Sequence, residues 1–137
     1  MKRSARNDSS PLKYHIPGII YAPKIVKPGR HEALCSQANL MPTVLGVLGA
    51  SYETRFFGRD VLRDPANRAF IGTELDLTLL VGNHHVVLSP GRKARMFAVE
   101  PDGSETPIEI DPDELDMAIA YYQGAGCVLK NHLYNAK

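Results

Sequence analysis

The sequence has no long apolar run and very few cysteines. None of its hydrophobic stretches reaches the ~18 residues that a membrane-spanning helix needs, and no apolar segment follows the basic start as a signal peptide requires. Cys35 and Cys127 lie far apart, which fits neither a CxxC metal site nor a dense disulfide framework, so we expect free thiols. From these absences the chain as written is expected to be soluble and cytoplasmic.

The common motifs of catalysis are missing too. The chain has no glycine-rich nucleotide-binding motif, no GxSxG nucleophile elbow, no HExxH pair and no DxD-type calcium loop. His84 and His85 are adjacent, but neighbouring residues of a strand point to opposite faces of a sheet, so we do not expect them to share a metal ion. We therefore predict no metal site and no catalytic residue, and a small hydrolase built on these histidines is the least favoured hypothesis.

Composition indicates one globular domain. The chain has 137 residues, of which 44% are hydrophobic and 23% charged, with a net charge of +1. Every charged residue in 1–31 except Asp8 is basic, but no aromatic residues are interleaved in the manner of a nucleic-acid-binding arm. We expect a flexible basic arm over 1–13, one domain over 14–137 and no nucleic-acid partner.

The first ordered segment is expected at Gly18–Ala22. This short apolar run stands between Pro17 and Pro23 and is typical of a strand buried on both faces. The two prolines cannot donate to a hydrogen-bond ladder, so they belong at the ends of the strand.

A helix is predicted over Leu40–Leu48. Asn39 can cap it, Gly49 can end it, and Gly46 indicates close packing against a neighbouring element. Its apolar face is expected to consist of Leu40, Val44, Val47 and Leu48.

Short strands rich in aliphatic and aromatic residues follow. They are predicted at Ala69–Thr73, Leu77–Val81, Val86–Ser89 and Met96–Glu100, with Gly82-Asn83 as a tight hairpin turn. The acidic stretch after them is interpreted as a turn that leads into a helix. Consecutive hairpins of this kind favour a small antiparallel sheet.

The closing helix has the strongest signals. Asp111 can cap it, Pro112 occupies the first helical position, and the helix is expected to end near Tyr134. The complete order of elements is strand, helix, antiparallel sheet and helix, which predicts an α+β fold. The apolar stripe of the closing helix is predicted to comprise Leu115, Ile119, Tyr122, Gly126, Leu129 and Leu133.

Arg55 and Arg59 flank the glycine-containing loop 56–58. Two guanidinium groups so close together could bind a phosphate or a carboxylate with forked geometry. Alternatively, the two phenylalanines of the loop anchor it to the core while Arg59 pairs with Asp60. We favour the second interpretation and keep the first open.

Several segments, taken together, carry a resemblance to known enzymes. They are Tyr14–Pro17, Ile20–Pro23, Ser36–Thr43, Tyr52–Asp60, Val87–Gly91, Ala120–Gln123 and Leu129-Lys130. In this order along the chain they are similar to the C-terminal part of the phosphoglycerol transferase and lipoteichoic acid synthase branch of the sulfatase-like alkaline phosphatase superfamily. Asn39 stands where that branch usually has aspartate.

The resemblance implies a fold and an activity for the parent enzymes. It implies a partial sulfatase-like α/β domain with a buried strand, a helix, a small antiparallel sheet and a long C-terminal helix. Parent enzymes transfer phosphoryl groups from phospholipid-derived substrates, using a hydroxyl nucleophile and a divalent metal such as manganese, magnesium, zinc or calcium. They are anchored in the inner membrane with an extracytoplasmic catalytic domain. The resemblance also makes His15, Arg55 and Arg59 candidates for substrate binding.

The nucleophile and the Asp-His-Gly metal motif of that branch have no counterpart in this chain. The leading hypothesis is therefore a C-terminal fragment that is inactive alone. The alternative is a free-standing binding or interaction module that keeps part of the fold. Because a strand such as Gly18–Ala22 needs its edges and faces covered, we expect self-association, a complementary N-terminal half, or cover from the chain's own arm.

Overall fold

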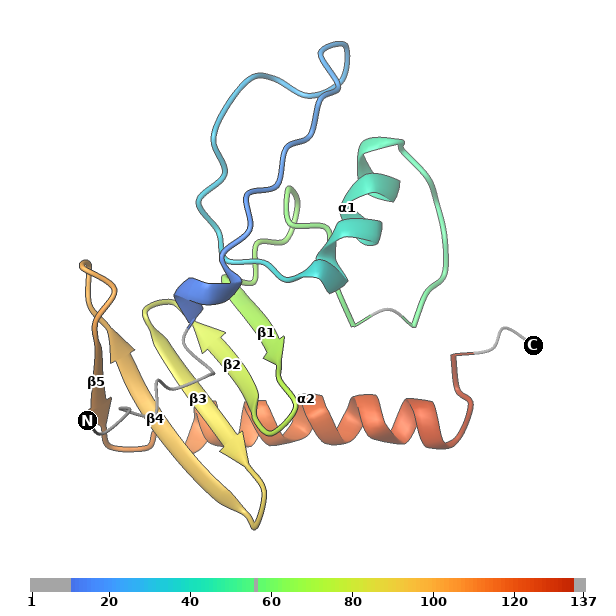
Figure 1. Cartoon of the computed structure of the whole chain (residues 1–137). Helices are drawn as coiled ribbons and strands as arrows, with labels where there is room; N and C mark the ends of the chain where they lie inside the picture. Colours follow the sequence, from blue (N-terminus) through green and yellow to red (C-terminus); the bar gives the residue numbers. More distant parts are fainter. Residues whose placement is uncertain (1–10, 56, 135–137) are drawn as a thin grey trace.

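The computed structural model describes residues 11–55 and 57–134. Figure 1 shows a twisted sheet with the long helix α2 (Pro112–Lys130) lying across one face, and a second lobe formed by the shorter helix α1 (Leu40–Val47) and long loops. The short 3-10 turns η1 (Pro11–Tyr14) and η2 (Gln37–Asn39) precede α1 in the chain. The predicted α+β fold is confirmed.

The sheet is a meander of five antiparallel strands in sequence order. Val81 lies opposite His84, so Gly82-Asn83 forms the predicted two-residue hairpin, and Gly82 adopts the positive φ of 58° that such a turn requires. The strands are β1 (Arg68–Gly72), β2 (Leu77–Val81), β3 (His84–Ser89), β4 (Lys93–Val99) and β5 (Glu105–Ile108).

The fifth strand was not predicted from the sequence. Its four residues lie in the acidic stretch that we interpreted as a turn, and they include Pro107, which weakens any strand prediction. In the structure β5 pairs only with β4 and forms one edge of the sheet, where a missing N–H donor is tolerated. The edge position explains why proline is compatible with the strand.

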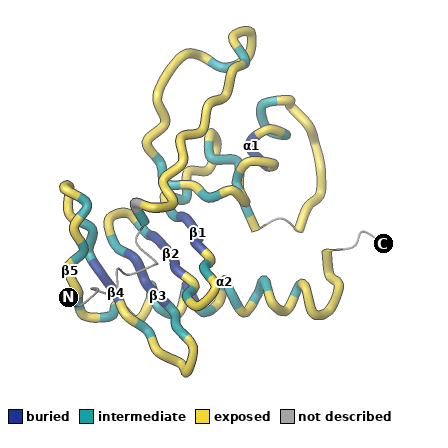
Figure 2. Tube along the Cα trace, viewed as in Figure 1, coloured by how far each residue is buried: buried dark blue, intermediate teal, exposed yellow. Residues whose placement is uncertain are grey.

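The main core lies between the sheet and α2. Leu79, Val86 and Met96 project from neighbouring strands onto Ala118 of the helix, and all four are buried. Figure 2 shows the buried residues concentrated in the strands, while most of the loops are exposed. Alternate strand residues form this face, as a sheet packed by a helix requires.

Helix α2 begins where the sequence predicts. The Asp111 side chain accepts hydrogen bonds from the backbone N–H groups of Asp113 and Glu114, at 2.8 and 3.1 Å, so the predicted cap is confirmed. The helix ends at Lys130, and its C-terminal part extends past the sheet (Figure 1). Leu129 is therefore 65% exposed, and the prediction that it is buried is wrong.

Helix α1 is confirmed, with Gly49 just after its end at a φ of 68°, but its buried face was wrongly predicted. Leu40, Val44 and Leu48 are exposed, whereas Thr43 is buried. The loop that follows α1 packs on the Thr43 side and leaves the leucine side uncovered.

No strand forms at Gly18–Ala22, so the prediction of a buried strand is wrong for this chain. Ile19 is 91% exposed and Tyr21 is 89% exposed in an extended loop. Among the described residues, strand pairing is confined to β1 through β5, and none of these strands pairs with this loop segment. Residues 1–10 of the predicted flexible arm over 1–13 lie outside the described residues. The rest of the arm belongs to η1, which spans Pro11–Tyr14.

None of the helices in the described ranges combines the length and the apolar character that crossing a bilayer takes.

Candidate functional site

Asn39 joins the start of α1 to the loop that carries the candidate arginines. Its side-chain Nδ2 donates to the carbonyl of Arg59 at 3.1 Å, and its Oδ1 accepts from the backbone N–H of Ser36 at 2.9 Å. The side chain therefore makes no capping hydrogen bond to α1, contrary to prediction. Asn39 instead fixes the backbone of Arg59 against the helix.

Thr43 provides a second tie between α1 and this loop. Its buried hydroxyl donates to the Asn39 carbonyl at 2.7 Å and accepts from the backbone N–H of Val61 at 3.1 Å. Because a hydroxyl can donate and accept at once, one side chain satisfies groups on both segments. The loop backbone is thereby held at Arg59 and at Val61, on either side of Asp60.

Two glycines allow the segments to approach closely. A Cβ atom at Gly58 would lie 1.8 Å from the carbonyl oxygen of Ala38, and one at Gly46 would lie 1.9 Å from Oδ2 of Asp60. The predicted close packing at Gly46 is thus confirmed. At Gly58 the obstacle is the backbone of Ala38, so only glycine fits there, whereas at Gly46 a side chain would require the Asp60 carboxylate to move.

Arg59 pairs with Asp64. The two side chains are 2.6 Å apart and about half exposed, and the hydrogen bond and charge of Asp64 raise the pKa of Arg59. Asp60, the partner expected from the sequence, instead lies 3.5 Å from Arg63. The local ion pair therefore exists with a different acid, and a phosphate at Arg59 would compete with Asp64.

Arg55 and His15 lie elsewhere. Arg55 donates to the carbonyl of Leu133, just beyond α2, and His15 lies exposed in the segment after η1. Phe57 packs near Gly124 of α2, with a ring atom 3.7 Å from where a Cβ would stand there, while Phe56 lies outside the described residues. Arg55 and Arg59 thus contact different groups, and the role of all three candidates in substrate binding stays a prediction.

The two adjacent histidines face opposite sides of the sheet, as expected. His84 lies 3.4 Å from Glu114 of α2, whereas His85 is fully buried on the other face, where it stacks on Phe97 with ring centres 5.1 Å apart. Its Nε2 is 3.9 Å from Glu105, too far for a hydrogen bond. Burial lowers the pKa of His85 and the Glu105 charge opposes this, so we expect a neutral imidazole at pH 7.

The resemblance implies a divalent metal for the parent enzymes, and such a metal requires several His, Cys, Asp or Glu side chains close together. Within residues 11–55 and 57–134, no three His, Cys, Asp or Glu side chains come close enough together to hold a metal ion. A catalytic zinc-type site needs about three such ligands. The described residues do not fit this metal, and no chemical step is derived through it.

A groove that sequence analysis missed lies between the β3–β4 hairpin and α2. Its volume is about 670 Å³, and its walls include the apolar side chains of Leu77, Leu88, Leu115 and Ile119. Arg92 and Gln123 provide polar groups along it. No local sequence signal marks this groove, because it depends on how the hairpin meets the helix.

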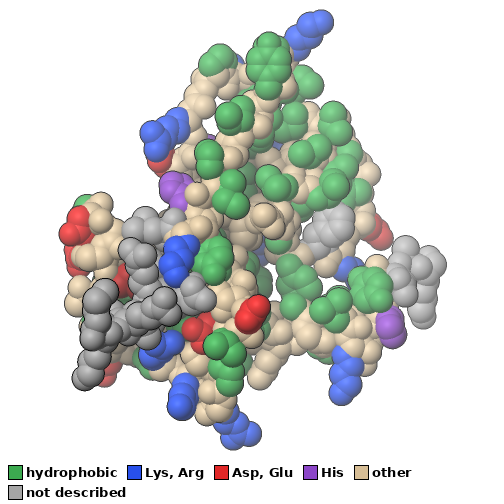
Figure 3. All heavy atoms as spheres, viewed as in Figure 1, with side chains coloured by type: hydrophobic (Ala, Val, Ile, Leu, Met, Phe, Trp, Pro, Cys, Tyr) green, Lys and Arg blue, Asp and Glu red, His purple; other side chains and the backbone are tan. Residues whose placement is uncertain are grey.

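A larger feature is the exposed apolar surface of the other lobe. Figure 3 shows hydrophobic side chains gathered over the long loop and α1. The exposed fractions reach 91% at Ile19 in the loop and 68% at Leu48 beside α1. The surface, called the apolar surface below, consists of Ile16, Ile19, Ile20, Tyr21, Ile25, Leu40, Met41, Val44 and Leu48.

Comparison with known proteins identifies the kind of domain. No family model matches the chain. A five-stranded antiparallel sheet with one long helix across it defines an α+β domain. This fold matches part of the crystal structure of a protein in the alkaline phosphatase superfamily from Vibrio parahaemolyticus, with a TM-score of 0.66 and 29% sequence identity.

The match is unequal in extent. It covers 72% of this chain but 25% of the Vibrio parahaemolyticus chain. The chain therefore has the fold of a fragment of an alkaline phosphatase superfamily domain, and it spans about a quarter of the length of that solved protein.

Proposed function

We propose that the chain is the C-terminal part of a sulfatase-like phosphoglycerol or phosphoryl-group transferase and that it has no turnover by itself. The observation that carries this proposal is the match at a TM-score of 0.66 to a quarter of an alkaline phosphatase superfamily protein. The absence of a metal-ligand cluster among the described residues supports the second half of the proposal.

In this role the chain completes a domain whose nucleophile and divalent metal belong to the remaining part. Arg59 is the best placed of the candidate substrate residues, because Asn39 holds its backbone carbonyl and Thr43 holds the loop again at Val61. Its guanidinium group could exchange Asp64 for a phosphate oxygen of a phospholipid-derived substrate. Arg55 and His15 complete the set of proposed substrate contacts.

Hydrolysis of bis(p-nitrophenyl) phosphate by the purified chain tests the proposal. We expect only background turnover, with or without manganese or magnesium, because the described residues bring together no metal-ligand set. Turnover that survives repurification and disappears in a His84→Ala, His85→Ala double variant would contradict the proposal. That result would favour a small metal-dependent hydrolase.

A second candidate is a free-standing interaction module, which the groove beside α2 favours. Its apolar walls, with the cations Arg92 and Lys93 at the hairpin, suit a short apolar segment of a partner protein. A module of this kind should be monodisperse at high concentration and unfold cooperatively. Sedimentation and chemical unfolding of the full chain separate this candidate from a fragment that needs the rest of its domain.

A further inference from the structure

The segment Gly18–Ala22 has the sequence of a strand but lies unpaired in the structure. We propose that it is a strand for the sheet of a complementary polypeptide, and that the exposed face of α1 packs on the same partner. This inference rests on the proposed function, because the partner is the remainder of an alkaline phosphatase superfamily domain.

The backbone of this segment is available for pairing. Among the described residues, no backbone hydrogen bond involves residues 18 to 21, and the carbonyl of Ala22 is the first to accept, from Ile25 and Val26 at 2.9 and 2.8 Å. Unpaired N–H and C=O groups in an extended segment provide a template for strand addition. Pro17 and Pro23 would limit the added strand to the residues between them.

The side chains of the segment require cover on both faces. Ile19, Ile20 and Tyr21 are consecutive, so they project alternately to the two faces of any strand that they form. They are 91%, 46% and 89% exposed. A strand that is apolar on both faces suits a sheet whose two faces are already covered by helices.

The apolar surface extends the same contact onto α1. Leu40, Val44 and Leu48 follow one another at helical spacing, and all three are exposed. Figure 3 shows that the hydrophobic side chains of α1 and of the long loop gather on the same lobe. Continuous apolar patches of this extent mark interaction sites.

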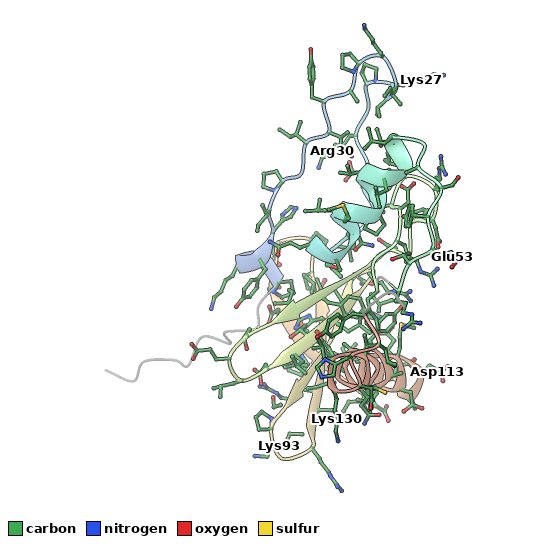
Figure 4. The ribbon with its side chains drawn as sticks, turned by 90° about the vertical axis from the view of Figure 1, so that its right-hand side faces the viewer. Lys27, Arg30, Glu53, Lys93, Asp113 and Lys130 are labelled. Atoms are coloured by element: carbon green, nitrogen blue, oxygen red, sulfur yellow. The ribbon has the colours of Figure 1, made fainter. Side chains whose placement is uncertain are left out.

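The charged residues of the loop lie around the strand and not within it. Lys27 stands at the outer end of the loop, and Arg30 lies on its returning limb, where it pairs with Glu32 at 2.7 Å (Figure 4). Residues 18–22 themselves contain no charge. The strand could therefore enter an apolar environment without burying a charge.

Three kinds of partner could cover the Gly18–Ala22 segment and the apolar surface, and physical arguments distinguish them. A second copy could offer the same segment, but a two-stranded ribbon with uncovered faces is marginal in water. It could also offer an edge of its own sheet, but that sheet has a helix across one face, whereas the segment is apolar on both. A lipid surface would leave the backbone groups of the strand unsatisfied. A partner with an open sheet edge satisfies both the backbone and the side chains, and the match to only 25% of the Vibrio parahaemolyticus chain leaves most of such a domain to the partner.

The experiment uses the full chain and, as the partner, the Vibrio parahaemolyticus protein shortened by the quarter that this chain matches. We expect the coexpressed polypeptides to copurify. The amide hydrogens of Ile19, Ile20 and Tyr21 should exchange rapidly in the isolated chain and become protected in the complex. The shortened partner could fail to fold by itself. A chimera therefore joins the full chain to it in place of the matched quarter, and the same protection of residues 19 to 21 is expected there.

Single substitutions test the surface. Ile19→Asp and Val44→Asp should each abolish copurification and protection while leaving the unfolding of the isolated chain unchanged, because both side chains are exposed there. Leu75→Asp is the matched control. Leu75 is 73% exposed in the turn before β2 and lies outside the apolar surface, so this variant should associate normally.

The contradicting outcomes are specific. Rapid exchange at residues 19 to 21 in both the complex and the chimera would overturn the inference, as would normal association of Ile19→Asp. A dimer of the isolated chain that Ile19→Asp dissociates would indicate a second copy instead, and Ile19-dependent binding to phosphatidylglycerol vesicles would indicate a lipid surface.

Activity separates this inference from the proposed function. Protection of the strand without phosphodiesterase turnover by the chimera would leave the docking inference standing and contradict the transferase role. Turnover by the chimera without protection of the strand would leave the transferase role standing and contradict the docking inference.

Discussion

The hydroxyl of Tyr122 donates to the backbone carbonyl of Thr78 at 2.8 Å. The same hydroxyl also lies 3.2 Å from the carbonyl of Ile71, which is the register partner of Thr78 across β1 and β2. Burial raises the pKa of Tyr122 to about 12, so the hydroxyl stays protonated and able to donate at neutral pH. One side chain of α2 thereby attaches the helix to the two strands nearest that end of the sheet.

Removal of this hydroxyl should weaken the fold. We expect Tyr122→Phe to lower the free energy of unfolding by about 1–2 kcal/mol, because a buried carbonyl loses its donor while the ring is kept. Urea unfolding monitored by circular dichroism measures the change. Tyr121→Phe is the control, since Tyr121 packs on Phe70 through its ring, and it should cost less than about 0.5 kcal/mol. Equal costs for the two variants would contradict the role given to the Tyr122 hydroxyl.

The cap of α2 gives a second prediction. Asp111→Ala removes the acceptor for two backbone N–H groups and should cost about 1 kcal/mol. Asp113→Ala should cost less, because the Asp113 side chain contributes mainly through the helix dipole. Thermal unfolding of both variants at low ionic strength gives the comparison, and a larger loss for Asp113→Ala would show that the cap is assigned to the wrong residue.

A leucine at the centre of the core and a leucine at the end of α2 should contribute differently to the free energy of unfolding. Leu79 is fully buried against α2, so Leu79→Ala should cost about 2–5 kcal/mol through lost burial and a residual cavity. Leu129 is 65% exposed, and Leu129→Ala should change the free energy of unfolding by less than about 0.5 kcal/mol, as should Lys130→Ala. A loss at Leu129 comparable to that at Leu79 would mean that the end of α2 is covered in solution.

Local signals in the sequence predicted local structure well. Asp111 with Pro112 defined the start of α2, and Gly82-Asn83 defined a hairpin, because caps and tight turns depend on a few neighbouring residues. The strand that contains Pro107 was missed for a related reason. Proline argues against a strand locally, and only the pairing of β5 at the sheet edge makes it acceptable.

Burial was predicted less well, because it depends on what packs against a face. The apolar stripe of α2 continues to Leu129, but the sheet ends before it. The leucine face of α1 and the run Gly18–Ala22 both have the pattern of buried elements, and the described residues leave most of both exposed. In these two places the sequence indicates packing that the described part of the chain does not supply.

The candidate site was predicted only in part. The sequence placed Arg55 and Arg59 beside a glycine loop, and the structure explains that glycine by the carbonyl of Ala38. The partner of Arg59 is Asp64, five residues further on, and no helical or strand spacing relates the two. Such a contact depends on the path of the loop, which Asn39 and Thr43 determine from a distant segment.

The glycines at this junction provide a further prediction. Gly58→Ala should cost about 1–3 kcal/mol, because the new methyl group would meet the backbone of Ala38, which cannot move independently. Gly126→Ala is the matched control within α2. Its Cβ would meet nothing within 4 Å, so the substitution should stabilise the helix by about 0.5–1 kcal/mol. Denaturation curves that show stabilisation by both variants would contradict the close approach at Gly58.

The buried imidazole of His85 predicts how stability depends on pH. Burial lowers the pKa of His85 in the folded chain below its ordinary value of 6.5, so the unfolded chain binds more protons just below that pH. Stability should therefore be complete above about pH 6.5 and fall as the pH is lowered from there towards the folded-state pKa. Urea midpoints measured from pH 7.5 to 5 should show this fall in the wild type and a smaller one in His85→Phe, where an aromatic ring can still stack on Phe97.

His15→Gln, which alters an exposed histidine, is the control and should keep the wild-type slope. An unchanged slope in His85→Phe would mean that the acid sensitivity of the fold comes from another group.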